Sequence, residues 1–172
     1  MSYYLAKFFS CLCCLLPGRF CDWLGGWIGR LTWSLVPRRR RRMASENIQR
    51  CLGMDAVAAE RVAKASWVRF GPMLLEVLRF PVLHNHMADY VEVTGQEYLE
   101  EAIAAGKGGI LATSHSGNWE LMGGVLASLG CPLVGVAMKQ KEAAMDRFIN
   151  DYRRRIGIRV VYKTSVRDMF RM

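Results

Sequence analysis

The chain has 172 residues, with 24 lysines and arginines against 15 aspartates and glutamates, which gives a formal net charge of +9. This length predicts one compact core, and the positive charge suits an anionic membrane surface, a nucleic acid or an acidic partner equally well. The six cysteines show no metal-ligand spacing and lie largely in apolar surroundings, so we expect no metal site and no disulfide framework, but reduced thiols facing the cytosol.

Residues 1–43 are predicted to form a membrane anchor. The apolar run 8–16 is interrupted by Pro17, and the next run, 20–36, contains two charged residues. Neither run provides the roughly 20 apolar residues of a membrane-spanning helix, so a tilted, re-entrant or interfacial anchor fits better. A cleaved signal peptide is the alternative, but no small-residue cleavage site follows the apolar run. The residues expected at the lipid headgroups are Trp23, Trp27 and Trp33.

A basic cluster directly follows this stretch and consists of Arg38, Arg39, Arg40, Arg41 and Arg42. Each basic side chain close to an anionic membrane contributes about 1 kcal/mol of attraction. The positive-inside tendency places the remainder of the chain in the cytoplasm. A solvated run of charges is the alternative. Nucleic acid is not expected as a partner, because no aromatic stacking platform or known module accompanies the charge.

Residues 44–89 are predicted to form an amphipathic helical region. Apolar side chains recur at roughly helical spacing from residue 45 to about residue 80, which predicts one or two amphipathic helices with a break near Gly71 and Pro72. The two histidines His84 and His86 are interpreted as part of a loop, because a nuclease or metal site would need a specific fold around them.

Residues 90–172 are predicted to form an α/β layer with a largely parallel sheet flanked by helices, because strands and helices alternate at βαβ lengths. The expected strands are 90–93, 109–113, 134–137 and 158–162. The expected helices are 96–105, 119–129 and 142–155. Ligands of such sheets bind beyond the carboxyl ends of the strands, and His115 lies just past one of these ends.

The segment after the expected strand 109–113 contains the candidate catalytic pair, His115 and Glu120. Gly117 allows the chain to fold back, so that Glu120 in the first turn of the next helix can reach one ring nitrogen of His115. The other ring nitrogen would then take a proton from an alcohol that attacks an ester or thioester. The alternative is a capping or core histidine and an acidic residue that compensates the helix dipole.

These residues resemble the late acyltransferases of lipid A biosynthesis, the lauroyl and myristoyl transferases, within the wider superfamily of His-x4-Asp/Glu glycerolipid acyltransferases. That family carries His, four residues, then Asp or Glu after a buried strand, and His115, Trp119, Glu120 and Gly123 look like this motif. The resemblance covers essentially the whole chain. A helix with basic residues, 146–157, is similar to the family helix whose arginine assists catalysis, and Arg153 matches that arginine.

The resemblance implies transfer of a fatty acyl group from acyl carrier protein to a hydroxyl of a lipid A precursor, with His115 as general base and Glu120 as its partner. The acyl carrier protein thioester is the expected donor, and no cofactor is expected. The implied location is the bacterial inner membrane, with the catalytic part facing the cytoplasm. The residues expected to bind substrate, or to offset oxyanion or phosphate charge, are Arg153, Ser116, Gly117, Lys139 and Arg155.

Two alternatives remain open. The acceptor could be a glycerophospholipid or a mannosylated inositol lipid, because the same His and acid arrangement serves those relatives, although Glu120 instead of Asp favours lipid A. The chain could instead be an inactive, truncated fragment that binds membranes, since it ends at Met172, where another helix is expected to begin and before the later acidic motif of the family. Residues 90–172 are accordingly expected to form the N-terminal part of the catalytic core.

Overall fold

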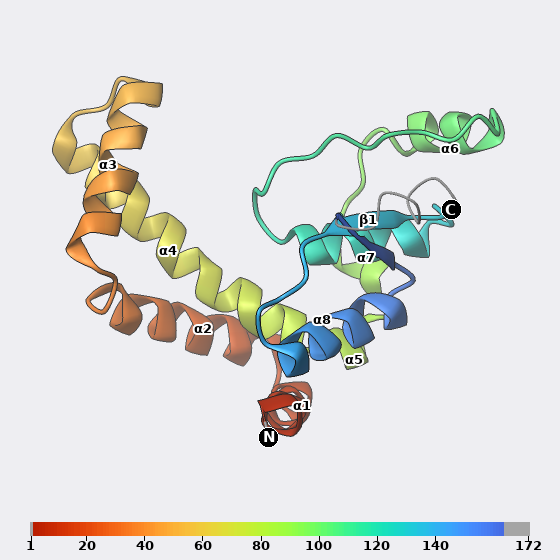
Figure 1. The fold of residues 1–172 in the computed structure, drawn as a ribbon, viewed down its shortest axis with the longest axis horizontal. Coiled ribbons are helices and arrows are strands. Elements are labelled where there is room, and N and C mark those ends of the chain that lie inside the picture. Colours follow the sequence, from red (N-terminus) through yellow and green to blue (C-terminus); the bar gives the residue numbers. More distant parts are fainter. Residues whose placement is uncertain (1, 164–172) are drawn as a thin grey trace. The chain divides into compact units, whose positions relative to one another are not determined.

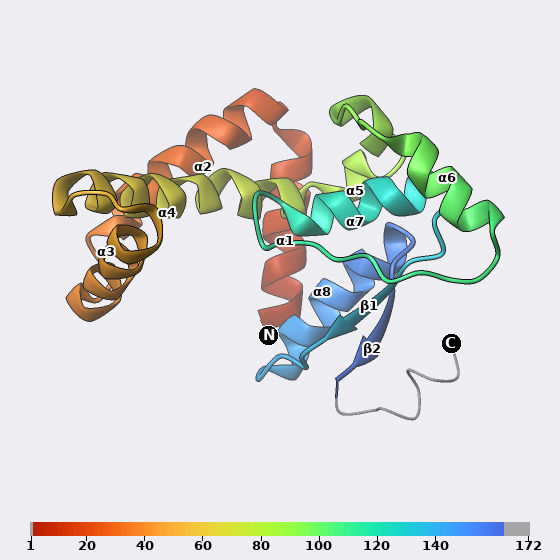
Figure 2. The same ribbon diagram turned by 90° about the horizontal axis from the view of Figure 1, so that it is seen from above.

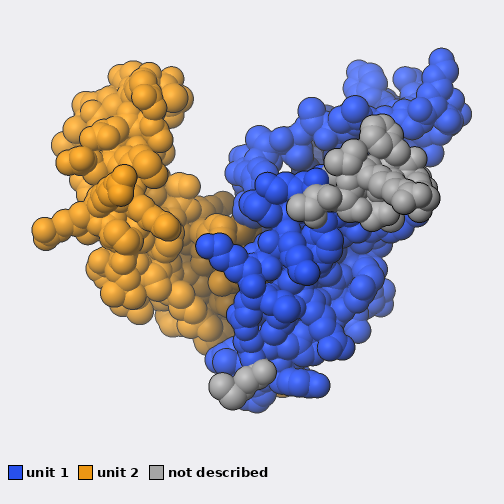
Figure 3. All heavy atoms as spheres, in the orientation of Figure 1, with its two compact units in different colours: residues 1–11, 79–172 blue, residues 12–78 orange. Residues whose placement is uncertain are grey.

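The computed structural model describes residues 2–163, apart from the side chains of residues 88 and 89. The chain is mostly helical and contains a two-stranded parallel sheet (Figure 1). It divides into two compact units (Figure 3). Unit 1 comprises residues 1–11 and 79–172, and unit 2 comprises residues 12–78. The boundaries expected at residues 43 and 89 are not the boundaries of these units.

The helices of unit 2 are separated by proline and glycine. Their order is α1 (Ser2–Leu15, which begins in unit 1), α2 (Gly18–Trp33), α3 (Arg38–Leu52) and α4 (Ala56–Leu78). Pro17 and Pro37 directly precede α2 and α3. Proline lacks an N–H, but at the start of a helix this removes no hydrogen bond within the helix. Gly53 ends α3 in the left-handed conformation with φ of 64°. Among residues 2–163, no helix is both long and apolar enough to cross a bilayer.

Close packing of α2 on α4 explains why the expected helix break near Gly71 and Pro72 is wrong. A Cβ atom on Gly71 would overlap the carbonyl oxygen of Gly25, and one on Gly29 would overlap the backbone of Val68. The two backbones therefore approach closely along α4, which continues through Pro72. Proline removes one backbone donor, and the contact with α2 offsets this loss. Two clusters of buried side chains complete the packing of unit 2. One consists of Cys13, Cys21 and Leu75, and the other of Trp33, Val36 and Ala63.

Unit 1 contains the elements that position the candidate site. Its order after α1 is α5 (Phe80–Leu83), the 3-10 helix η1 (Met87–Tyr90), α6 (Gln96–Ala104), α7 (Trp119–Ser128), β1 (Val134–Ala137), α8 (Ala143–Arg155) and β2 (Arg159–Tyr162). The two strands pair in parallel, with Val134 opposite Arg159 and Ala137 opposite Tyr162. Helix α8 connects them and packs against β2 (Figure 2). The predicted positions of α6, α7, β1, α8 and β2 are confirmed to within one residue at each end.

The predicted strands 90–93 and 109–113 are wrong. Tyr90 ends η1, and the apolar segment 109–113 is irregular and solvent-exposed, with Ile110 99% exposed. A strand needs a neighbour for its backbone hydrogen bonds, and β1 pairs within the described residues only with β2. The largely parallel sheet is therefore two-stranded in this part of the chain. The further helix expected to begin at Met172 lies outside the described residues.

The buried side chains of unit 1 come from several elements, and they include Met87 of η1, Val125 of α7 and Val161 of β2. Gly123 and Gly124 allow α7 to approach its neighbours, since a Cβ on Gly123 would overlap Ile158 and one on Gly124 would overlap Met87. Phe148 and Tyr152 of α8 are almost completely buried. The close approaches at Gly123 and Gly124 join α7 to η1 and to the residue that precedes β2.

Candidate active site

An ion pair between Glu120 and Arg153 joins α7 to α8. The Arg153 Nε–H donates to Glu120 Oε2 at 2.9 Å, and its Nη2 donates to the other carboxylate oxygen. The side chains are mostly buried, 14% exposed for Glu120 and 19% for Arg153. The hydrogen bond to Glu120 raises the pKa of Arg153, against the effect of burial, which lowers it. A bidentate pair of this kind fixes both the position and the plane of the carboxylate.

Local structure explains the placement of Glu120. Asn118 caps α7 by accepting the Leu121 N–H on its side-chain oxygen at 3.1 Å. Glu120 follows in the first helical turn, where a negative charge interacts favourably with the helix dipole. Arg153 lies in the last turn of α8, where a positive charge is favourable for the same reason. Both ends of the pair are therefore stabilised by their own helices as well as by each other.

His115 lies in the exposed segment that precedes α7. Its ring packs against Trp119, with the ring centroids 4.9 Å apart and the planes inclined by 55°. Gly117 has φ of 64°, so the chain turns sharply there, and both Ser116 and Gly117 are exposed. Among the described side chains, His115 and Glu120 form no hydrogen bond or ion pair with each other. The structure thus brings Glu120 to Arg153 and His115 to Trp119, and the direct His115–Glu120 contact stays a prediction.

Among the described residues, neither of the two other predicted substrate-binding cations forms an ion pair with Glu120. Lys139 is exposed and follows β1, and its charge contributes to the lowered pKa of Asp146. Arg155 is also exposed, and its charge contributes to the lowered pKa of Lys7 in α1, for which burial is the main cause. Of the predicted cations, Arg153 alone is shown in contact with Glu120.

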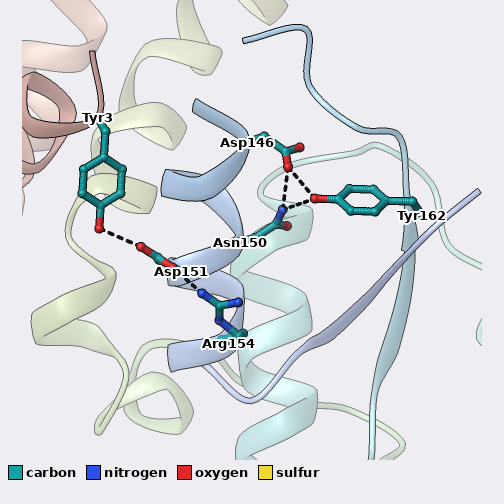
Figure 4. A network of polar contacts seen from close by, with 6 residues as sticks. All are labelled: Tyr3, Asp146, Asn150, Asp151, Arg154 and Tyr162. Atoms are coloured by element: carbon teal, nitrogen blue, oxygen red, sulfur yellow. Dashed lines mark hydrogen bonds and ion pairs between the residues drawn. The ribbon is translucent and has the colours of Figure 1, made fainter. Parts of the chain in front are cut away.

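Two sets of contacts were not predicted from the sequence. In the first, Asp146 accepts hydrogen bonds from Asn150 at 3.3 Å and from the Tyr162 hydroxyl (Figure 4). It also accepts the Gln140 N–H at 2.8 Å. The hydrogen bond from Tyr162 is the main cause of the lowered pKa of Asp146. The available sequence signal was the spacing of Asp146, Asn150 and Arg153, which places three polar residues on one face of α8.

The second set joins α1 to α8. The Tyr3 hydroxyl donates to Asp151 at 2.7 Å, and the Tyr152 hydroxyl donates to Ser10. The Lys7 ammonium lies over the Tyr152 ring, 4.5 Å from its centroid. Residues predicted to belong to a separate anchor therefore support the helix that carries Arg153, and the sequence offered no signal for this contact beyond the helical spacing of these α1 residues.

The predicted membrane-contact residues differ in exposure. Trp23 is 57% and Trp27 is 47% exposed, whereas Trp33 is buried against Val36 and Ala63. Trp33 therefore has a core position in unit 2 and not the exposure that a headgroup contact needs. The five arginines 38–42 form the start of α3 and are mostly exposed.

Within residues 2–163, no group of three or more His, Cys, Asp or Glu side chains is arranged to hold a metal ion. Over the same residues the cysteines form no disulfide.

Comparison with known proteins gives a family match over the whole chain. A family model described as bacterial lipid A biosynthesis acyltransferase matches residues 1–172. Phosphatidylinositol mannoside acyltransferases from two strains of Mycobacterium tuberculosis are each 35% identical over 121 residues, or 67% of this chain and 38% of theirs. The protein of that name from Mycolicibacterium smegmatis is 29% identical over 121 residues, or 69% of this chain and 40% of its own. The chain thus matches about two fifths of the length of these curated relatives. No solved structure matches the chain significantly.

Proposed function

Because the chain belongs to the bacterial lipid A biosynthesis acyltransferase family, we propose that it moves a fatty acyl group from a thioester to a hydroxyl of a membrane glycolipid. The observation that carries this proposal is the Glu120–Arg153 ion pair at the start of α7, together with an exposed imidazole in the segment that directly precedes this helix. The pair fixes a carboxylate at the start of α7, and the His115 ring contacts Trp119, the residue that directly precedes Glu120. A base that substrate can reach and a fixed carboxylate are what acyl transfer to an alcohol requires.

In the proposed mechanism, His115 acts as general base. A ring nitrogen takes the proton of the acceptor hydroxyl as the oxygen attacks the thioester carbonyl. The imidazolium then returns this proton to the leaving thiolate, so that ester and thiol are formed and no net proton is consumed. The backbone N–H groups of Ser116 and Gly117 are the proposed donors to the negative oxygen of the intermediate.

Glu120 can serve His115 without releasing Arg153. Each carboxylate oxygen accepts two hydrogen bonds, and Arg153 occupies one position on each oxygen. A remaining position can accept the second ring N–H of His115 when the exposed segment closes over a substrate. Catalytic hydrogen bonds commonly form only in the substrate complex, and Arg153 would keep the carboxylate oriented until then.

The donor and the acceptor are proposed from different observations. Exposed Lys139 and Arg155, together with the net charge of +9, favour a donor on an acidic carrier such as acyl carrier protein. The family description favours a lipid A precursor as acceptor. A mannosylated inositol lipid is the second candidate, because the curated relatives carry that acceptor in their names. Labelled acyl carrier protein supplied with each acceptor in turn distinguishes the two.

We propose that the protein works at the cytoplasmic face of the bacterial inner membrane. Exposed Trp23 and Trp27 and the basic start of α3 support attachment at the lipid interface. Replacing the five arginines 38–42 with glutamine should weaken binding to anionic vesicles. Equal binding of the two proteins would contradict this attachment.

The central test is His115→Ala, with His86→Ala as the matched control. Loss of a general base should lower the transfer rate by about 10²- to 10⁴-fold, whereas His86→Ala should retain the wild-type rate. Because His115 is exposed, its removal should change the free energy of unfolding by less than about 0.5 kcal/mol. Near-normal transfer by His115→Ala would contradict the mechanism, and no transfer by the wild-type chain to either acceptor would contradict the proposed function.

A further inference from the structure

A buried carboxylate connects three segments around the Glu120–Arg153 pair. Asp146 is 8% exposed, although it carries a charge. One of its oxygens accepts the Gln140 N–H, from the segment that follows β1. The other accepts from Asn150 on α8 and from the Tyr162 hydroxyl at the end of β2 (Figure 4). Asn150 also donates to the Tyr162 hydroxyl at 2.9 Å, so the three side chains form a closed set of contacts.

These contacts lie along the face of α8 that carries Arg153. Asp146, Asn150 and Arg153 occupy positions i, i+4 and i+7 of the helix, which places them on one side. The charge of Asp146 acts on Arg153, and after Glu120 it is the next acidic contribution to the raised pKa of the guanidinium. Asp146 is thus both a link between α8 and its neighbours and a negative charge on the helix face that carries Arg153.

We infer that Asp146 is a positioning residue of the proposed acyl-transfer site, which fixes α8 against β2 and the 138–142 segment and thereby holds Arg153 on Glu120. The importance of this role for catalysis rests on the function proposed above. Asp146 does not contact the reacting atoms in this account. It acts through Arg153, and the segment that it fixes through the Gln140 N–H contains Lys139, a proposed substrate-binding residue.

The substitution Asp146→Asn changes this arrangement without changing its size. The amide oxygen of asparagine can still accept the Gln140 N–H. Its amide nitrogen, however, cannot accept the hydrogen bonds that the second carboxylate oxygen accepts from Asn150 and from the Tyr162 hydroxyl. The charge near Arg153 is also lost. Asp151→Asn is the matched control, because it removes a charge from the same helix at a position whose partners are Tyr3 and Arg154 (Figure 4). Its amide oxygen can still accept the Tyr3 hydroxyl, so the contact between α1 and α8 is retained.

The first measurement needs no enzymatic activity. In ¹⁵N–¹H spectra of the full chain, the Arg153 Nε–H signal is assigned by its loss in Arg153→Lys, and its hydrogen exchange is compared among variants. Asp146→Asn should accelerate this exchange at least about tenfold, since the ion pair opens more often, and Asp151→Asn should leave it unchanged. Equal protection in Asp146→Asn and the wild type, or equal acceleration in both variants, would overturn the inference.

The second measurement is acyl transfer. Misplacement of a positioning group costs about 10- to 10²-fold in rate, so Asp146→Asn should lower kcat by that factor with a smaller change in KM. In the Arg153→Ala background it should cause little further loss, because its effect passes through Arg153. Full additivity of the two substitutions would overturn the inference. If the wild-type chain transfers no acyl group while Asp146→Asn still loosens Arg153, the proposed function fails and the positioning role stands.

Discussion

Removing Arg153 should destabilise the protein, because it leaves a mostly buried carboxylate without its partner. Exposed ion pairs contribute about 0–1 kcal/mol, whereas breaking a fully buried pair costs about 3–5 kcal/mol. The Glu120 side chain is 14% exposed and accepts two hydrogen bonds from Arg153. The expected loss for Arg153→Ala is therefore intermediate, about 2–3 kcal/mol.

This loss can be measured by thermal and urea unfolding followed by circular dichroism. For a chain of this length, 1 kcal/mol corresponds to about 2–4 °C, so Tm should fall by about 5–10 °C in Arg153→Ala. Arg154→Ala is the matched control. Its side chain is 70% exposed and pairs with Asp151 at the surface, so its removal should cost no more than about 1 kcal/mol.

A second substitution tests whether the cost comes from the unpaired charge. Glu120→Gln removes the buried carboxylate, so Glu120→Gln/Arg153→Ala should be more stable than Arg153→Ala alone, by at least about 1 kcal/mol. If Arg153→Ala loses less than about 0.5 kcal/mol of stability, or if the double variant is less stable than Arg153→Ala, the pair does not act as a buried ion pair.

Three further outcomes are expected. The Tyr3 hydrogen bond holds the pKa of Asp151 below its usual 3.8. Asp151 therefore stabilises the folded state at pH values above 3.8, and this stability is lost as the pH falls through the lower folded pKa. Asp151→Asn should accordingly lose less stability on acidification below about pH 5 than the wild type does. Burial lowers the pKa of Lys7, so below pH 10.5 the unfolded state binds more protons than the folded state. The free energy of unfolding should therefore rise from neutral pH toward 10.5, and this rise should be smaller in Lys7→Met. An identical pH dependence in the two proteins would contradict this prediction. Gly71→Ala should lower the free energy of urea unfolding by about 1–3 kcal/mol, because the new Cβ overlaps the α2 backbone. In the control Gly26→Ala, the Cβ meets only the flexible Arg30 side chain, so this change should be neutral or stabilising by up to about 1 kcal/mol. Equal effects of the two substitutions would show that α2 and α4 can separate.

Local patterns were sufficient for α6, α7 and α8 and for the two paired strands. The helix that contains Glu120 begins after a capping asparagine, and α8 ends before Gly157, whose φ is 86°. Such signals act over a few residues, so they can be recognised without knowing the neighbours. The motif around His115 and Glu120 is equally local, whereas Arg153 is expected only from the family resemblance, and the catalytic roles of all three stay predictions.

Contacts between distant residues could not be predicted in this way. The segment 109–113 has a strand-like sequence, but whether it pairs depends on a neighbour elsewhere in the chain. Gly71 and Pro72 looked like a helix break, and the close approach of α2 keeps the helix continuous. At each of the two places, the local sequence allows two structures. The contact with α2 decides between them at Gly71 and Pro72, and the lack of a pairing strand among the described residues decides between them at 109–113.

The sequence by itself determined which residue types the site contains, and with them the family. Tertiary structure decided their partners: Glu120 with Arg153, 33 residues apart, and Asp146 with Tyr162, 16 residues apart. It also decided that Trp33 is buried and that the first residues of α1 support α8. A buried charge accepts whichever donor the packing of its helices brings within reach, and that packing is set by apolar surfaces spread over the whole unit.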